Sequence, residues 1–237
     1  MASPQNRPYV VDPARRPVFP EGLEPDENGL IAVGGDLSEA VLIEAYGKGL
    51  FPWMDAPPLL WFSPDPRLVL YPQDFHLSRR LARVLRQGRF SVRFDEDFEG
   101  VISACASVPR PGQRGTWIDE RFKQAYTRLY RRHLVHCVSA KREGTLCGGL
   151  YGLSLGRIFF GESMFSLLPN ASKVALFHLV EWVKQRQFIL IDCQASSEHL
   201  LGLGAVEIPR SLFHAHLREG LKFPTLDYPW VRGPAGN

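Results

Sequence analysis

One short apolar segment ends in three residues that could do chemistry together. Residues 188–192 have the pattern of a buried strand, and Asp192, Cys193 and Gln194 stand at its carboxyl end, where mixed α/β folds place working groups. Strand alternation puts Asp192 and Gln194 on one face and Cys193 on the other. A carboxylate beside a primary amide can hold an attacking amine and a carbonyl oxygen together. The alternative is that Asp192 only caps the next helix.

A second carboxylate, Glu162, lies in the aromatic segment 159–165. An acid in such surroundings is destabilising unless it is paired or functional. If this segment is a strand beside residues 188–192, Glu162 approaches Asp192, and two close carboxylates raise the pKa of one of them. The alternative is a buried glutamate held by backbone donors.

Other chemistries find less support in the sequence. The order of elements resembles that of acetyl-CoA-dependent N-acetyltransferases, but residues 163–173 contain no glycine where those enzymes carry a glycine-rich pyrophosphate loop. No CoA or other cofactor is therefore expected. His214 and His216 have no third ligand nearby, so no metal is expected. Cys193 and His199 could form a thiol nucleophile pair, but alternation turns Cys193 inward.

A basic helix is expected over residues 77–87. The stretch from His76 to Arg93 holds six arginines and no acid, and Arg79, Arg83 and Arg86 lie about one turn apart. Such a face can neutralise phosphates. The alternative is an ordinary solvated face of a helix.

The whole chain must form a fold that positions these groups. Its 237 residues are 45% hydrophobic and 22% charged, with a net charge of +3, which is typical of a folded globular protein. No apolar stretch is long enough to span a membrane, and no secretory leader is evident, so a cytoplasmic protein without a membrane partner is expected. Four cysteines without a C-x-x-C pair predict reduced, mostly buried thiols.

The pattern of elements predicts an α+β fold around a central mixed sheet. We expect a small N-terminal domain over residues 1–66 and a catalytic domain over residues 67–237. The first has an irregular arm (1–28), a strand (30–33), a helix ending near 47 and an aromatic loop (49–66). The second is expected to contain strands 67–71, 90–94, 135–140, 146–153, 157–162 and 188–192, and helices 77–87, 95–106, 119–132, 171–186, 198–203 and 210–218. Asp95, Asp119 and Asn170 are the expected N-caps.

Several ordered motifs then point to a known family. They include Gly34-Gly35-Asp36-Leu37-Ser38, Gly49-Leu50-Phe51-Pro52-Trp53, Ser63-Pro64-Asp65-Pro66-Arg67, Gly148-Gly149-Leu150-Tyr151-Gly152, Phe160-Gly161-Glu162-Ser163-Met164-Phe165 and Ile191-Asp192-Cys193-Gln194. With these motifs the chain resembles the bacterial leucyl/phenylalanyl-tRNA–protein transferases over about residues 18–218.

The resemblance implies a fold and a reaction. The expected fold is a small N-terminal domain plus an acetyltransferase-like (GNAT-like) domain that uses tRNA in place of CoA. The enzyme would transfer Leu or Phe, and Met less well, from aminoacyl-tRNA to proteins that begin with Arg or Lys. The product would be an N-degron, and the enzyme would act as a monomer. Asp192 would hold the amine and take its proton, Gln194 would orient the amine or the ester carbonyl, and Glu162 would support them.

The resemblance also implies the binding residues. The apolar amino-acid pocket would consist of Leu150, Phe159, Met164, Leu176, Leu179, Val183 and Ile191. Tyr46, Trp53 and Trp117 would lie near the 3′-terminal adenosine, and Arg79, Arg80, Arg83 and Arg86 would contact the tRNA stem. Arg80 departs from the family, where serine is common. Two competing hypotheses are a CoA-dependent N-acetyltransferase and a non-catalytic RNA-binding protein.

Overall fold

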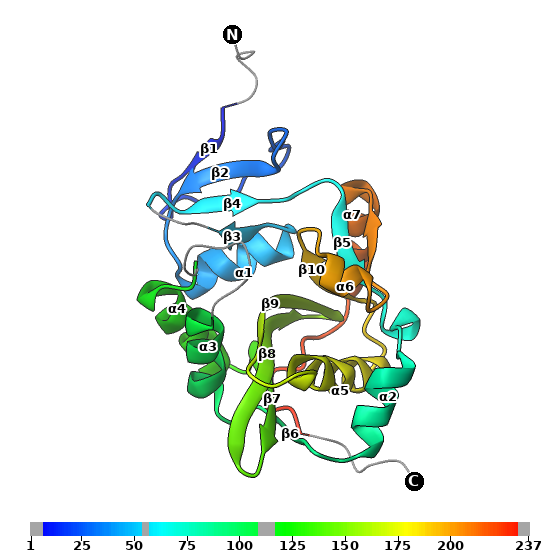
Figure 1. Ribbon diagram of the computed structural model, residues 1–237. Helices are drawn as coiled ribbons and strands as arrows, with labels where there is room; N and C mark the ends of the chain where they lie inside the picture. The colour runs from blue at the N-terminus through cyan, green and yellow to red at the C-terminus, as the bar shows by residue number, and fades with distance from the viewer. Residues whose placement is uncertain (1–6, 54–56, 109–116, 232–237) are drawn as a thin grey trace.

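The computed structural model describes residues 7–53, 57–108 and 117–231. Two β-sheets divide the chain in sequence order: strands between residues 9 and 62 form the first sheet, and strands from residue 67 onward form the second. The first sheet lies at one end of the molecule (Figure 1). Within the described ranges, none of the helices has the length and apolar character needed to cross a membrane.

The first sheet has four strands in the order β1-β2-β4-β3. They are β1 (Tyr9–Val11), β2 (Leu30–Gly34), β3 (Phe51–Trp53) and β4 (Leu60–Phe62), and helix α1 (Glu39–Gly47) packs beside them. The expectation of a structureless aromatic loop over 49–66 is therefore wrong, because β3 and β4 lie inside it. The irregular arm likewise contains β1, which pairs in parallel with β2.

The second sheet has seven strands in the order β11-β5-β10-β9-β8-β7-β6. Their bounds are β5 (Arg67–Leu70), β6 (Ser91–Phe94), β7 (Val135–Arg142), β8 (Thr145–Leu155), β9 (Ile158–Ser166), β10 (Leu190–Gln194) and β11 (Val206–Ile208). Only the β9–β10 pair is parallel among the described strands of this sheet. The sheet is mixed and the fold is α+β, as the sequence predicts.

Helices cover both faces of the second sheet (Figure 1). They are α2 (Arg79–Arg86), α3 (Phe98–Ser107), α4 (Glu120–Arg131), α5 (Ala171–Gln185), α6 (Glu198–Leu201) and α7 (Arg210–Gly220), with a 3-10 turn η1 (Pro72–Asp74). Consecutive glycines of β8 show the two faces. A Cβ at Gly148 would lie 2.6 Å from Ala171 of α5, whereas one at Gly149 would face Val101 of α3. The small residues of β8 thus let α5 approach the sheet closely.

Strand alternation sorts the apolar side chains into two cores. On β7, Val135 and Cys137 join the core under α3 and α4, while Val138 and Ala140 join the core under α2 and α5. The first core continues into the first sheet through α1. The two sheets therefore share one apolar interior on that side.

The predicted helix caps have mixed outcomes. Asp119 caps α4 as expected, because its carboxylate accepts from the backbone N–H groups of Arg121 and Phe122. Asn170 precedes α5 but has φ of 69° and makes no cap hydrogen bond. Asp95 does not cap α3, since its carboxylate instead accepts from His136 Nδ1 and Cys137 N. The prediction for Asp95 is therefore wrong, since Asp97 holds the N-cap position of α3, whereas Asn170 holds the predicted N-cap position of α5 without a side-chain hydrogen bond.

Candidate active site

Strands β9 and β10 separate at their carboxyl ends and leave a notch. They pair only as far as Phe160 and Asp192, although β9 continues to Ser166. Glu162 and Gln194 lie two residues past that last pair. Gln194 Nε2 donates to Glu162 Oε1 across the notch at 2.9 Å. The divergence of parallel strands thus brings a carboxyl group and a primary amide together.

Glu162 forms a closed ring of hydrogen bonds with two tyrosines. Tyr46 of α1 donates to Oε1 and Tyr126 of α4 donates to Oε2, each at 2.7 Å. The two phenol oxygens are themselves 2.6 Å apart. Three contacts need three protons, and the phenols supply only two. A proton on Glu162 supplies the third: the neutral acid then donates to one phenol, and that phenol turns its own hydrogen to the other, which completes the ring.

The environment of Glu162 favours that neutral form. Its pKa is raised from 4.5 to about 7, because burial and the negative charge of Asp192 raise it by more than the hydrogen bonds from Tyr46, Tyr126 and Gln194 lower it. Burial is the largest of these effects, as the aromatic sequence around Glu162 suggests. The carboxyl group is therefore able to exchange a proton near neutral pH.

Asp192 occupies a different place from the one expected. Its side chain is fully buried and forms a bidentate pair with Arg67, at 2.8 Å from Nε and 2.6 Å from Nη2. The Arg67 guanidinium lies between the rings of Phe51 and Phe213, 4.8 and 4.5 Å from their centroids. Asp192 Oδ1 also accepts from the backbone N–H of Gln194. Asp192 therefore holds the end of β10 in place and does not face the cavity.

The expected alternation fails at the end of β10. The register against β5 shifts between Asp192 and Gln194, and Gln194 has φ of 66°. As a result Cys193 and Gln194 both line the cavity, while Asp192 does not. Burial raises the pKa of the Cys193 thiol, which disfavours a thiolate nucleophile.

An open cavity of about 650 Å³ leads to the notch from the α5 side. Its apolar wall contains Leu150, Phe159, Met164, Leu176, Leu179 and Ile191. Its lining also includes Trp53 and several polar residues: Ser163, Ser166, Ser172, Ser196, Ser197 and His199. An apolar wall with a few convergent polar groups is the form of a small-molecule site.

Three of the residues expected to bind the amino acid or the adenosine lie outside the cavity lining. Val183 is fully buried in the core under α5. Tyr46 is also fully buried and contacts Glu162 instead. Trp117 packs edge-on against Phe122, with ring centroids 5.2 Å apart. Trp53, by contrast, is 39% exposed at the cavity rim, which suits a stacking platform for a base.

Two residues at the site were missed by sequence reasoning. Tyr126 belongs to the apolar face of the predicted helix 119–132, and only the structure shows that its hydroxyl reaches Glu162. Arg67 ends the motif Ser63-Pro64-Asp65-Pro66-Arg67, and an arginine at the start of an apolar strand is a signal of a buried ion pair. That signal was present in the sequence.

The four predicted RNA-contact arginines lie together on α2. Arg79, Arg80, Arg83 and Arg86 are all exposed, and none forms an ion pair with another residue of the described ranges. Helix α2 packs against α5, which lines the cavity. A positive, unpaired face thus flanks the site.

Comparison with known proteins identifies relatives over most of the chain. Residues 69–218 match the family described as leucyl/phenylalanyl-tRNA protein transferase, and residues 35–65 match its N-terminal domain. A protein named leucyl/phenylalanyl-tRNA–protein transferase from Anaeromyxobacter sp. strain K is 51% identical over 223 residues, covering 94% of this chain and 96% of that protein. One of the same name from Pseudomonas entomophila strain L48 is 53% identical over 208 residues, covering 87% and 91%.

Two solved structures have weak likenesses to this chain. A conserved protein of unknown function from Staphylococcus epidermidis has 11% identity and a TM-score of 0.40, over 76% of this chain and 68% of that one. L-PGS from Bacillus licheniformis also has 11% identity and a TM-score of 0.40, over 71% and 54%. At these scores the likenesses do not bear on what this chain does.

Proposed function

Because this chain belongs to the leucyl/phenylalanyl-tRNA–protein transferase family, and is thus an aminoacyltransferase, we propose its donor and acceptor substrates. It transfers Leu or Phe, and Met less well, from aminoacyl-tRNA to the α-amino group of proteins beginning with Arg or Lys. The product carries a new N-terminal residue that acts as a degradation signal. The observation that carries this proposal is an apolar cavity that ends at the Glu162–Gln194 pair.

The apolar wall supports the choice of amino acid. Leu150, Phe159 and Leu176 offer hydrocarbon surface with no charged group, so a Leu, Phe or Met side chain is stabilised there and a charged one is not. Such a wall separates substrates that differ by one methylene by only ~1–3 kcal/mol. Imperfect exclusion of Met is therefore expected.

In the reaction, the acceptor amine attacks the ester carbonyl carbon of the aminoacyl-tRNA. A C–N bond forms, the C–O bond to the ribose breaks, and the amine loses a proton while the ribose oxygen gains one. We propose that the Glu162 carboxylate takes the amine proton, since its pKa of about 7 is suited to neutral pH. The Gln194 amide oxygen accepts a hydrogen bond from the amine and orients it. The ester is already activated, so alignment of the reactants supplies much of the rate.

The remaining residues act by position. Asp192 and Arg67 fix the end of β10 and therefore the backbone of Gln194. Trp53 stacks on the terminal adenosine, and the α2 arginines contact the acceptor stem without reading its sequence. The mixed seven-stranded sheet supports the expected acetyltransferase-like architecture, with tRNA in place of CoA.

Transfer of labelled Leu from Leu-tRNA tests the proposal. The acceptors are two model proteins that differ only in a first residue of Arg or Ala, and wild type is compared with Glu162→Gln. Transfer to the Arg protein alone, lost in the variant while tRNA binding persists, is the expected result. A wild-type enzyme that binds tRNA but transfers neither Leu, Phe nor Met would instead support a non-catalytic RNA-binding protein, and acetyl-CoA binding would support an N-acetyltransferase.

A further inference from the structure

The segment after α7 returns along the second sheet and is anchored at both ends. Near its start, Gly156 N donates to Thr225 Oγ1 at 2.9 Å at the β8–β9 turn. Near its end, Trp182 Nε1 of α5 donates to the carbonyl of Val231 at 3.0 Å. The orange-to-red trace in Figure 1 runs beside the sheet toward β6. The path delivers one large side chain, Trp230, into the core under α5.

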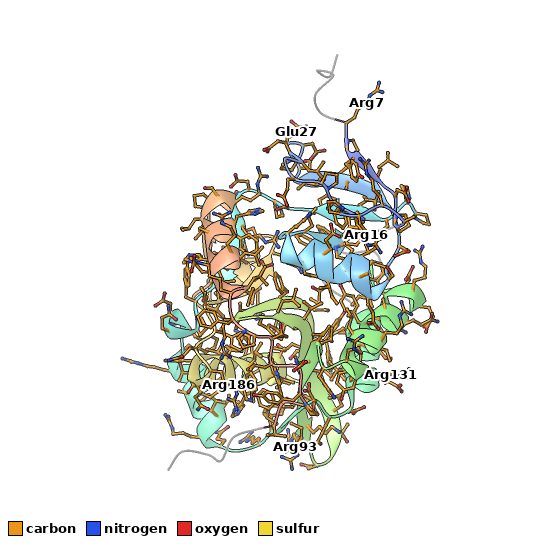
Figure 2. The ribbon with its side chains drawn as sticks, turned by 180° about the vertical axis from the view of Figure 1, so that it is seen from behind. Arg7, Arg16, Glu27, Arg93, Arg131 and Arg186 are labelled. Carbon is orange, nitrogen blue, oxygen red and sulfur yellow. The ribbon has the colours of Figure 1, made fainter. Side chains whose placement is uncertain are left out.

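Trp230 is the centre of a stacked column. Its ring lies 3.8 Å from the ring of His136 and 3.8 Å from that of Trp182, at interplanar angles of 10° and 19°. Arg186, labelled in Figure 2 at the end of α5, caps the column 3.7 Å above the Trp182 ring. The backbone N–H of Trp230 donates to Asp95 Oδ2 at 2.6 Å. The indole is fully buried, so it has no room to shift on its own.

Trp230, at the centre of this column, packs against Phe159, a residue of the cavity wall. Trp230 and Phe159 have centroids 5.8 Å apart at an angle of 42°. Phe159 lines the cavity and is otherwise buried. Because protein interiors are closely packed, the position of the Phe159 ring depends on the indole behind it. Trp230 therefore acts on the cavity through Phe159 without touching its contents.

We propose that Trp230 is a specificity-determining positioning residue, which sets the depth of the aminoacyl cavity by supporting Phe159. This inference rests on the proposed function, because the cavity is taken to hold the side chain of the transferred amino acid. A smaller residue at 230 leaves a void into which Phe159 can retreat. The deeper cavity then favours Phe over Leu.

A competition assay measures this preference directly. Phe-tRNA and Leu-tRNA with different radiolabels are mixed in one reaction with an Arg-initiated acceptor. The ratio of products gives the ratio of the two kcat/KM values and does not depend on the fraction of active enzyme. We expect Trp230→Phe and Trp230→Leu to raise the Phe-to-Leu ratio by about three- to tenfold, at or below the lower end of the roughly 10–200-fold that one methylene within a pocket is worth.

Two further variants separate specificity from stability. Trp61→Phe makes the same change at another fully buried tryptophan, on β4 of the first sheet and outside the cavity lining, and should leave the ratio unchanged. In a Phe159→Leu background, Trp230→Phe should no longer shift the ratio, because its effect passes through Phe159. If the Trp230 variants do not fold, Asp95→Asn weakens the hold on the Trp230 backbone and should shift the ratio in the same direction.

The outcomes distinguish this inference from the proposed function. A ratio that stays constant, or that Trp61→Phe changes equally, overturns the role of Trp230 while wild-type transfer still supports the enzyme. An unchanged effect of Trp230→Phe in the Phe159→Leu background overturns the route through Phe159. A wild-type enzyme that transfers neither amino acid overturns the proposed function and this inference with it.

Discussion

Burial and hydrogen bonding have opposite effects on the pKa of the Glu162 carboxyl group. Burial raises the pKa, and donation from Tyr46, Tyr126 and Gln194 lowers it, leaving a value of about 7. The same three donors hold the carboxyl at the mouth of the notch. A group that is half ionised near neutral pH and fixed in place is suited to accept a proton from an incoming amine.

The raised pKa predicts a specific dependence of stability on pH. Between the ordinary value of 4.5 and about 7 the folded protein retains a proton on Glu162 that the unfolded chain has lost. The free energy of unfolding therefore falls as pH rises through this window, by roughly 3 kcal/mol from this group alone. Glu162→Gln imitates the neutral acid and should remove the fall. Urea unfolding of both proteins at pH 5 and pH 8 measures it.

The expected pattern is similar stability at pH 5 and a more stable variant at pH 8. Transfer should behave oppositely: Glu162→Gln lacks the proton acceptor, and loss of a general base lowers the rate by about 10²–10⁴-fold. A variant that is less stable than wild type at both pH values, by the same amount, would contradict a raised Glu162 pKa.

The buried Arg67–Asp192 ion pair leads to a second prediction, which concerns the stability of the protein. Both side chains have no exposed surface, so removing one charge leaves the other buried without a partner. Asp192→Asn should destabilise the protein by about 3–5 kcal/mol, measured by urea unfolding. Asp119→Asn is the control, because its partner Arg121 is exposed, and such pairs contribute about 0–1 kcal/mol. Equal effects at the two sites would contradict the account of Asp192.

At the scale of elements, the sequence predicts β2 and the strands β5 to β10 and misses the three-residue strands β1, β3, β4 and β11. Strands β7, β8 and β9 are apolar stretches of eight or more residues, long enough to be visible in the sequence. Strands β3 and β4 have three residues each, too few for a period, and Pro52 within β3 suggests a loop. Pro52 is tolerated because β3 is an edge strand.

The candidate site was partly predictable from strand alternation and from which strands neighbour each other. Alternation and strand neighbours bring Glu162 close to the end of β10, as expected. Alternation also predicts that Asp192 and Gln194 share a face. There it fails, because the register against β5 shifts after Asp192 and Gln194 has a positive φ, and the sequence of β10 signals neither feature.

From the exposed arginines of α2 we predict a contact with RNA whose affinity depends on salt concentration and not on the RNA sequence. Each phosphate contact changes the slope of log affinity against log salt by about 0.7–0.9. The double variant Arg83→Gln/Arg86→Gln should therefore weaken aminoacyl-tRNA binding and reduce the slope by roughly 1.4–1.8 in a filter-binding titration. Its preference between Leu and Phe should not change, because α2 is not part of the cavity lining.

Arg131 supplies the matched control for α2. It is an exposed arginine on α4, on the other face of the second sheet, and Figure 2 shows it at the edge of the molecule. Arg131→Gln removes one charge and is compared with the single variant Arg83→Gln, which should reduce the slope by about 0.7–0.9, whereas Arg131→Gln should leave it nearly unchanged. An equal fall in slope for Arg131→Gln would mean that net charge, and not the α2 face, attracts the RNA.

At the scale of the whole molecule, the site is assembled from both sheets. The first sheet and α1 contribute Trp53, Phe51 against Arg67, and Tyr46 against Glu162. The second sheet contributes Glu162, Gln194 and the apolar wall. Neither part contains the complete set, so the Glu162 ring forms only when the two parts are joined.

Because the site is shared between the two sheets, we predict that the first sheet and the second sheet unfold together. The Tyr46–Glu162 bond and the Arg67 stack are buried, and the apolar core under α3 and α4 continues into the first sheet. Opening the first sheet alone would expose that core and leave Glu162 without one of its donors, which is strongly unfavourable. Native-state hydrogen exchange should therefore give the slowest amides of β2 and β4 the same opening free energy as those of β8 and β9, within about 1 kcal/mol. Amides of β2 and β4 that exchange several kcal/mol more easily would show an independently opening first sheet, and would contradict a site built across both parts.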